Sequence, residues 1–279
     1  MLNKRNRKIA QVVTYVLLVV FSVYCIFPFV WMVISALKPK TEIRTATPSF
    51  AIIEPTLENF KRVLFDVGFL NYIKNSLLVS VVACVLSMIV AILAGYALSR
   101  YFKLKLVKAS NLAMMLSQMI PGVLLLVPLY LIMQRLHVLE SYLSLILAYT
   151  TFVIPLCTFM MSSFFDTVPL ALEEAAEIDG CSKAQTILRI ILPLSIPSLV
   201  STGLYAFINA WNEFLYSLIL INSTELMTVS VALRSLQGAE ILDWGSMMAA
   251  STLVVIPSVV FFMFIQKYIA GGMTEGSVK

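Results

Sequence analysis

Charged side chains are scarce in this sequence: they account for 13% of its 279 residues, whereas 60% of the residues are hydrophobic. A soluble domain carries about 25% charged residues, because water must solvate its surface. Intrinsic disorder needs the opposite composition, with much charge and few apolar residues. The low charge content therefore excludes a water-soluble globule and a disordered chain, and it indicates an integral membrane protein.

Residues for several kinds of chemistry are scarce as well. His137 is the single histidine, and four cysteines are too few for a disulfide scaffold in a chain of 31.1 kDa. No glycine precedes a lysine, so the phosphate-binding pattern G-x-x-x-x-G-K-[ST] is absent. We expect no metal site, no catalytic residue and no cofactor in this chain. The pI near 9.0 reflects membrane topology and anionic lipid, and no nucleic-acid partner is expected.

The sequence does contain six long apolar stretches, whose only charge well inside a stretch is Glu213. A helix that crosses about 30 Å of hydrocarbon needs about 20 apolar residues, and each stretch is long enough. They show no alternation of apolar and polar residues, which disfavours a β-barrel. The first is far longer than the apolar region of a secretory signal peptide, so we expect it to be retained. The predicted spans are 9–37, 75–99, 109–134, 141–165, 197–221 and 244–266.

Six spans place both termini on the same side of the membrane. Short loops rich in Lys and Arg remain in the cytoplasm, and two such clusters fall on the side of the termini. We therefore expect a cytoplasmic N-tail (1–8), a cytoplasmic C-tail (268–279) and an extracytoplasmic loop (38–74). The residues of the two basic clusters are Lys4, Arg5, Arg7 and Lys8, and Arg100, Lys103, Lys105 and Lys108.

The loop at 166–196, which this topology places in the cytoplasm, predicts two short helices. Pro169 suits a first helical position, and Gly180 suits the left-handed residue after a helix end. Ser182 and Gln185 have the spacing of a capping box, which opens a second helix. Five acids between Asp166 and Asp179 favour docking into a cytoplasmic protein. The alternative is a helix resting on lipid headgroups, but such helices favour Lys and Arg.

The same loop carries a resemblance to a known family. Glu174-Ala175-Ala176, Gly180, Ile190 and Leu192-Pro193 fill every position of the EAA---G---------I-LP signature of ABC importer permeases. The resemblance extends over nearly the whole chain and is to the second permease of maltose-type carbohydrate importers. The supporting segments are Ser35-Ala36-Leu37-Lys38-Pro39, Leu57-Glu58-Asn59-Phe60, Asn75-Ser76, Gly95-Tyr96-Ala97-Leu98-Ser99-Arg100, Ile178-Asp179-Gly180, Trp211-Asn212-Glu213-Phe214 and the tail from Gly271.

The resemblance implies an all-α membrane protein with six transmembrane helices and the type I importer permease fold, its ABC type-1 domain covering 72–267. The 166–196 loop would couple the chain to an ATPase subunit. The implied partners are a second, homologous permease in a heterodimer, two ATPase subunits that bind ATP and Mg²⁺, an extracytoplasmic solute-binding protein and a sugar. The implied location is a bacterial or archaeal cell membrane. The expected coupling residues are Glu173, Glu174, Ala175, Ala176, Glu177, Asp179 and Gly180.

Glu213 is the one acid well inside a predicted span. A charge near the bilayer centre costs about 2.5–3.5 kcal/mol on insertion scales, so such a residue normally faces a cavity or a partner group. A continuous helix from Pro197 would raise it by about 24 Å. One interpretation is a polar and aromatic lining for a sugar pathway, and the other is a structural hydrogen bond. The candidate pathway residues are Gln118, Asn209, Trp211, Asn212 and Glu213.

Other functional classes fit the sequence less well. An ion-driven secondary transporter usually has internal repeats and relays of ionisable residues, and the sequence shows no repeat and one intramembrane acid. A membrane enzyme would need convergent polar groups, and a channel would need a filter segment. Among substrates, a di- or oligosaccharide is expected, with a polyol or glycerol phosphate as the alternative. The absence of Lys and Arg from the spans favours a neutral sugar.

Overall fold

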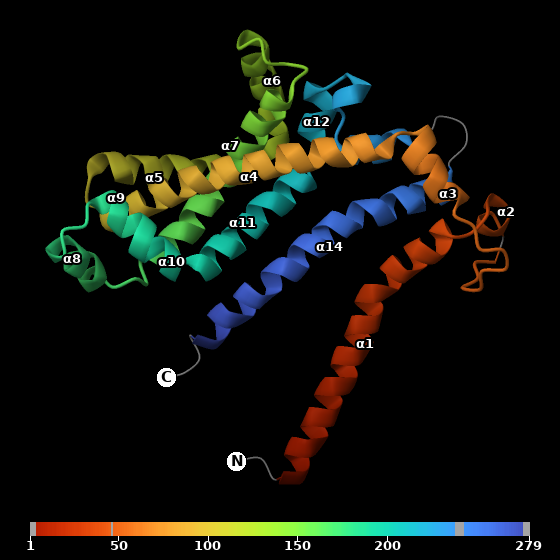
Figure 1. Ribbon diagram of the computed structural model, residues 1–279, viewed down its shortest axis with the longest axis horizontal. Coiled ribbons are helices and arrows are strands. Elements are labelled where there is room, and N and C mark those ends of the chain that lie inside the picture. Colours follow the sequence, from red (N-terminus) through yellow and green to blue (C-terminus); the bar gives the residue numbers. More distant parts are fainter. Residues whose placement is uncertain (1–3, 46, 238–242, 276–279) are drawn as a thin grey trace. The chain divides into compact units, whose positions relative to one another are not determined.

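The computed structural model of the chain describes residues 4–45, 47–237 and 243–275, and the regular structure of these ranges is entirely helical (Figure 1). The chain divides into two compact units. The first comprises Met1–Phe69 and Leu233–Ile256, and the second comprises Leu70–Ala232 and Pro257–Lys279.

The first unit contains α1 (Lys4–Ala36), α2 (Lys40–Ile43), α3 (Glu58–Lys61), the π-helical turn η1 (Arg62–Asp66) and the start of α14 (Trp244–Glu275). Asn59 connects its segments: its side-chain amide donates to the backbone oxygens of Ala36 and Lys38, each at 2.9 Å. The same amide lies against Gly245, where a Cβ would come within 2.5 Å of the Asn59 Oδ1. Only glycine permits α14 to begin so close to Asn59.

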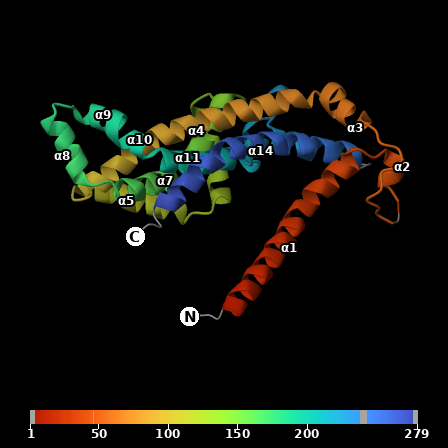
Figure 2. The same ribbon diagram turned by 60° about the horizontal axis from the view of Figure 1, so that its bottom comes forward.

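The second unit is a bundle of helices around α7. Its elements are α4 (Phe69–Arg100), α5 (Lys105–Gln118), η2 (Gly122–Leu125), α6 (Leu126–Arg135), α7 (Tyr142–Phe165), α8 (Leu170–Ile178), α9 (Lys183–Thr186), η3 (Ile187–Ile191), α10 (Leu192–Leu194), α11 (Ile196–Trp211), α12 (Leu215–Leu220), η4 (Thr224–Leu226), α13 (Val229–Ser235) and the remainder of α14. Figures 1 and 2 show α8 and α9 together at one end of this bundle.

The helix α7 forms the core of the second unit. In its most apolar stretch 56% of the residues are buried, against 28% for α4. Gly95 allows α4 to approach α7 closely, because a Cβ there would lie 2.9 Å from the Met161 Cβ and 3.0 Å from the Thr158 carbonyl oxygen. The two helices therefore meet almost backbone to backbone near the C-terminal end of α4.

Four helices of the described residues are long and apolar enough to cross a membrane: Lys8–Ala36, Phe69–Arg100, Tyr142–Phe165 and Trp244–Lys267. Two further helix pairs reach that length only when each bent pair is counted as one span, which gives up to six. The first pair joins Lys105–Gln118 to Gly122–Arg135 at 105°, and the second joins Lys183–Leu194 to Ile196–Trp211 at 83°.

The residues of the predicted spans 109–134 and 197–221 do not each form one continuous helix. Pro121 disfavours helical backbone at the preceding residue and lacks an amide hydrogen, and the chain leaves α5 just before it. In the second case α11 ends at Trp211 and α12 starts at Leu215. Glu213 lies in this break, so the estimate of 24 Å along one helix does not apply.

Candidate functional site

The 166–196 loop has the local structure that its sequence predicts. The helix α8 begins at Leu170, one residue after Pro169, whose backbone is extended. Gly180 has φ of +83°, the left-handed conformation expected after the helix. Ser182 and Gln185 then form both hydrogen bonds of a capping box at the start of α9. These local features orient α8 and α9 as two short helices joined by a tight turn.

The predicted coupling residues fall into two groups. Glu173 and Ala176 are buried, with 9% and 3% of their surfaces exposed. The other group is exposed, and it consists of Glu174, Ala175, Glu177, Asp179 and Gly180. Ile178, beside them, is 87% exposed, which is unusual for a large apolar side chain. One side of α8 thus faces the protein, and the other offers three acids, a small residue and an isoleucine for contact.

The buried side of α8 is bound to the end of α4 by an ion pair. The Arg100 Nε donates to the Glu173 Oε1 at 2.6 Å, and 9% and 12% of the two side chains are exposed. The Tyr96 hydroxyl donates to the other oxygen, Glu173 Oε2, at 2.6 Å. The Arg100 Nη2 also donates to the Val168 carbonyl oxygen at 3.0 Å. Both oxygens of one carboxylate are therefore bound by side chains from adjacent turns of α4.

Two more contacts join the same end of α4 to the loop. The Ser99 hydroxyl donates to the Asp166 carboxylate. The Lys183 Nζ donates to the Tyr101 hydroxyl at 2.7 Å and lies 5.2 Å from the centre of that ring. Sequence reasoning identified Arg100 only as a topological charge and a motif residue, because nothing local indicates a partner that lies 73 residues away.

Glu213 binds the backbone at the break between α11 and α12. Its carboxylate accepts from the backbone N–H of Tyr216 at 2.9 Å and of Ser217 at 3.1 Å. These are donors that the first turn of α12 leaves without helical partners, and a negative charge there also complements the helix dipole. A structural hydrogen bond, one of the two interpretations made from the sequence, is present in this geometry.

Glu213 also lines a concavity of about 290 Å³ in the second unit, and Asn209 is the other predicted pathway residue there. Trp211 is buried and stacks on Phe207 at 5.8 Å between ring centres, while Gln118 and Asn212 are exposed and outside this lining. The sequence analysis missed the aromatic wall, because tyrosines and phenylalanines in apolar helices are usually core residues. That wall is formed by Tyr149, Phe152, Tyr205 and Tyr216.

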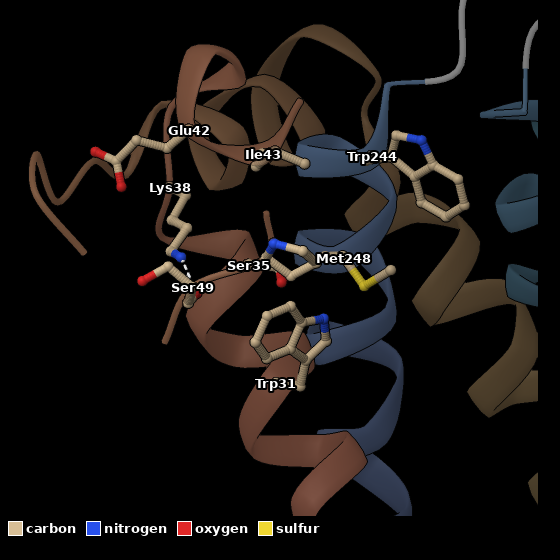
Figure 3. A pocket seen from close by; sticks show the side chains of 9 residues that line it. Trp31, Ser35, Lys38, Glu42, Ile43, Ser49, Trp244 and Met248 are labelled. Carbon is tan, nitrogen blue, oxygen red and sulfur yellow. Dashed lines mark hydrogen bonds between the residues drawn. The ribbon is translucent and has the colours of Figure 1, made fainter. Parts of the chain in front are cut away.

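A second concavity, of about 230 Å³, lies in the first unit (Figure 3). Trp31 and Trp244 line it together with Lys38, whose ammonium donates to the Ser49 carbonyl oxygen and lies 5.9 Å from the centre of the Trp31 ring. Glu42 is oriented by the backbone N–H groups of Ile53 and Glu54, at 3.1 and 2.8 Å. Nothing in the sequence pattern indicated this concavity.

Asp243 binds two cations at the same end of the first unit. The Arg62 Nη1 lies 2.8 Å and the Lys40 Nζ 3.2 Å from its Oδ2. Partial burial raises the pKa of Asp243, but Lys40 and the hydrogen bonds from Ser246 outweigh this effect and lower the pKa below its ordinary value. The contacts fix the start of α14 beside η1.

Long apolar helices, with the short helices α8 and α9 at one end, are typical of a polytopic membrane protein. The comparisons identify which kind. Residues 87–275 match the family described as binding-protein-dependent transport system inner membrane component, and the chain belongs to this family.

The relatives agree over nearly the whole chain. The inner membrane ABC transporter permease protein YcjP of Escherichia coli is 35% identical over 99% of both chains. The diacetylchitobiose uptake system permease protein DasC of Streptomyces coelicolor is 35% identical over 94% of both, and the trehalose/maltose transport system permease protein MalG of Thermococcus litoralis is 34% identical over 99% of both.

A solved structure matches the fold. It is a bacterial ABC transporter involved in the import of the acidic polysaccharide alginate, with a TM-score of 0.81, 20% identity, and coverage of 96% of this chain and 99% of that chain. The predicted fold class, an all-α importer permease, is confirmed. The protein is an integral membrane transport subunit rather than an enzyme, and it works with ATPase, solute-binding and permease partners.

Proposed function

We propose that this chain forms part of the pathway for a di- or oligosaccharide in an ATP-driven importer that operates by alternating access. Relatives of similar length are named for the uptake of diacetylchitobiose and of trehalose and maltose. The observation that carries the proposal is the two-sided helix α8, which is bound to α4 on one side and exposes acids and Ala175 on the other. Such a helix can dock on a separate subunit and remain part of this one.

The docking surface consists of Glu174, Ala175, Glu177, Asp179 and Gly180. Ala175 lets a partner backbone approach, and the acids complement cationic groups of an ATPase subunit. ATP and Mg²⁺ bind to the ATPase subunits, so this chain contributes no cofactor site. Glu173 and Ala176, which are buried, support the docking helix from within instead of contacting the ATPase.

The sugar pathway runs past the concavity at the break between α11 and α12. Sugars bind through hydrogen bonds and by stacking on aromatic faces, and Asn209, Glu213 and the tyrosines of the wall offer both. Trp211 is buried outside this lining and stacks on Phe207. Gln118 and Asn212 are exposed and lie outside this lining. We assign them to the part of the pathway that a second permease completes.

We place both termini and the 166–196 loop in the cytoplasm of a bacterial or archaeal cell. The basic residues that flank the predicted spans support this orientation. A heterodimer with a homologous permease, two ATPase subunits and an extracytoplasmic binding protein that delivers sugar to the opposite side complete the importer.

A charge reversal on the docking surface tests the coupling role. Glu174→Lys should lower the amount of ATPase that co-purifies with the chain by about tenfold or more, because like charges across an interface are strongly unfavourable. Glu54→Lys, the same reversal on an exposed residue of the 38–74 loop, should leave co-purification unchanged. Equal co-purification of both variants would mean that the exposed side of α8 does not dock an ATPase.

Uptake into vesicles tests the substrate class. The reconstituted importer with its binding protein should accumulate a labelled di- or oligosaccharide, and neutral sugars should compete better than a polyol or glycerol phosphate. Glu213→Gln should weaken uptake if the carboxylate contacts the sugar. Unchanged affinity and selectivity would leave Glu213 only its role at the start of α12.

A further inference from the structure

The buried ion pair between Arg100 and Glu173 calls for an explanation that docking alone does not give. Removing two charges from water is costly, and well-packed apolar residues can stabilise a fold as well as a buried pair does. Glu173 differs from its exposed neighbours Glu174 and Glu177, because its carboxylate is directed at the end of α4 and both of its oxygens are bound. An apolar contact would attach α8 to α4 without fixing its orientation.

The hydrogen bonds restrict both elements. Arg100 uses three nitrogens of its planar guanidinium: Nε binds Glu173, Nη2 binds the Val168 carbonyl oxygen, and Nη1 binds the Ser99 hydroxyl at 2.9 Å. Tyr96, one turn earlier on α4, binds the second carboxylate oxygen. Charge-assisted bonds to both sides of one carboxylate fix direction as well as distance, so α8 cannot rotate or slide relative to α4 without breaking them.

The chain itself gives α8 only two connections, to α7 through residues 166–169 and to α11 through α9, η3 and α10. Residues 73 positions apart supply a third connection, to α4. At Gly95, one residue before Tyr96 and five before Arg100, α4 lies almost backbone to backbone against α7. A displacement of α8 is therefore passed to two packed helices rather than absorbed by a flexible loop.

We propose that Arg100 and Glu173 are positioning residues that transmit the movement of the docked α8 to α4, so that nucleotide-driven movement of the ATPases moves this helix directly. The proposal rests on the docking role proposed above for the exposed side of α8. The pair acts between the ATPase and the pathway, and it touches neither nucleotide nor sugar. Coupling of this kind is a difference in free energy between two arrangements of a rigid element.

The test uses Arg100→Gln, Glu173→Gln and the double variant in the complete importer, reconstituted with its binding protein. ATPase subunits should co-purify with all three variants, and ATP hydrolysis should continue. Sugar transported per ATP hydrolysed should fall by about tenfold. The double variant should lose no more coupling than the worse single variant, because both changes remove one interaction. It also leaves no unpaired buried charge, so a coupling defect there does not arise from one.

Arg135→Gln is the matched control, because Arg135 is likewise the last residue of its helix but is exposed. It should transport sugar with wild-type coupling. Arg100→Lys keeps the charge without the planar set of donors and should fall between wild type and Arg100→Gln. A double variant with wild-type transport per ATP would overturn the proposal. Failure of the docking role gives a different result. The wild-type chain would then neither co-purify with ATPase nor show sugar-stimulated hydrolysis, and this result would overturn both the docking role and the coupling role of the ion pair.

Discussion

Glu173 and Glu213 are both carboxylates among the apolar helices of the second unit, but the protein binds them in different ways. The partners of Glu173 are the side chains of Arg100 and Tyr96, 73 and 77 positions away in the sequence. The partners of Glu213 are backbone amides three and four residues ahead. The first arrangement joins α8 to α4, which do not follow each other in the chain, whereas the two backbone bonds of Glu213 cap the start of α12. An acid bound by distant side chains ties two helices together, whereas an acid bound by the next backbone amides along the chain stabilises one helix end.

The largest expected effect is on the free energy of unfolding when Glu173 loses its cationic partner. Arg100→Met leaves the Glu173 carboxylate with Tyr96 but without its cation, and an unpaired buried charge costs about 3–5 kcal/mol. The free energy of unfolding, measured by denaturant titration of the purified chain in detergent, should fall by that amount. The double variant Arg100→Met/Glu173→Met should recover most of the loss. A single variant within about 1 kcal/mol of wild type would show that the pair is solvated, and the contrast with Glu213 would disappear.

A smaller effect is expected at the break between α11 and α12. Glu213→Ala removes the acceptor of two backbone N–H groups and should cost about 1–2 kcal/mol, the usual range for loss of a helix cap. Glu213→Gln keeps an acceptor oxygen and should cost less than Glu213→Ala. The same titration measures both. If Glu213→Ala destabilised the chain as much as Arg100→Met, the carboxylate would have a charged or long-range role that its two backbone bonds do not explain.

The two acids also show which features of the fold can be predicted from the sequence: those that depend on neighbouring residues. Gly180 and the Ser182–Gln185 capping box act over a few residues, and the structure has both where the sequence places them. Long charge-free stretches likewise predict the helices α1, α4, α7 and α14, since a helix needs only about 20 apolar residues to cross the hydrocarbon. The partner of Glu173 depends on how α4 and α8 lie in space, and no periodicity or spacing reports that.

The broken spans are an intermediate case. Pro121 is visible in the sequence, but a proline can kink a transmembrane helix or end it, and only tertiary packing decides the bend of 105°. Glu213 precedes the new helix α12, but the apolar residues around it indicated one continuous span. The aromatic wall of the concavity beside it includes Tyr149 and Tyr216, which composition cannot distinguish from core residues. The sequence therefore predicts those parts of the candidate sites whose contacts are between near neighbours in the chain. It does not predict the parts whose contacts depend on how helices pack.

The smallest effect is expected for Glu140, which combines the two arrangements. Its partners are backbone N–H groups, as for Glu213, but they belong to Asn222 and Ser223, 82 and 83 positions away. Partial burial raises the pKa of Glu140, but the hydrogen bonds from these residues outweigh it and lower the pKa below its ordinary value. A lowered pKa means that the charged form stabilises the fold above the ordinary value, and that this contribution is lost as the pH falls through the lowered value.

Thermal unfolding of wild type and Glu140→Gln between neutral and acid pH tests whether the charged Glu140 carboxylate stabilises the fold. Wild type should unfold at the higher temperature near pH 7, and the gap should close as the carboxylate is protonated at acid pH. The change should be the smallest of the three, because Glu140 is exposed and water and salt weaken its interactions. A gap that stays constant with pH would mean that the side chain acts by shape alone. Of the two acids with distant partners, only Glu173, whose partner is a buried cation, would then stabilise the fold through its charge.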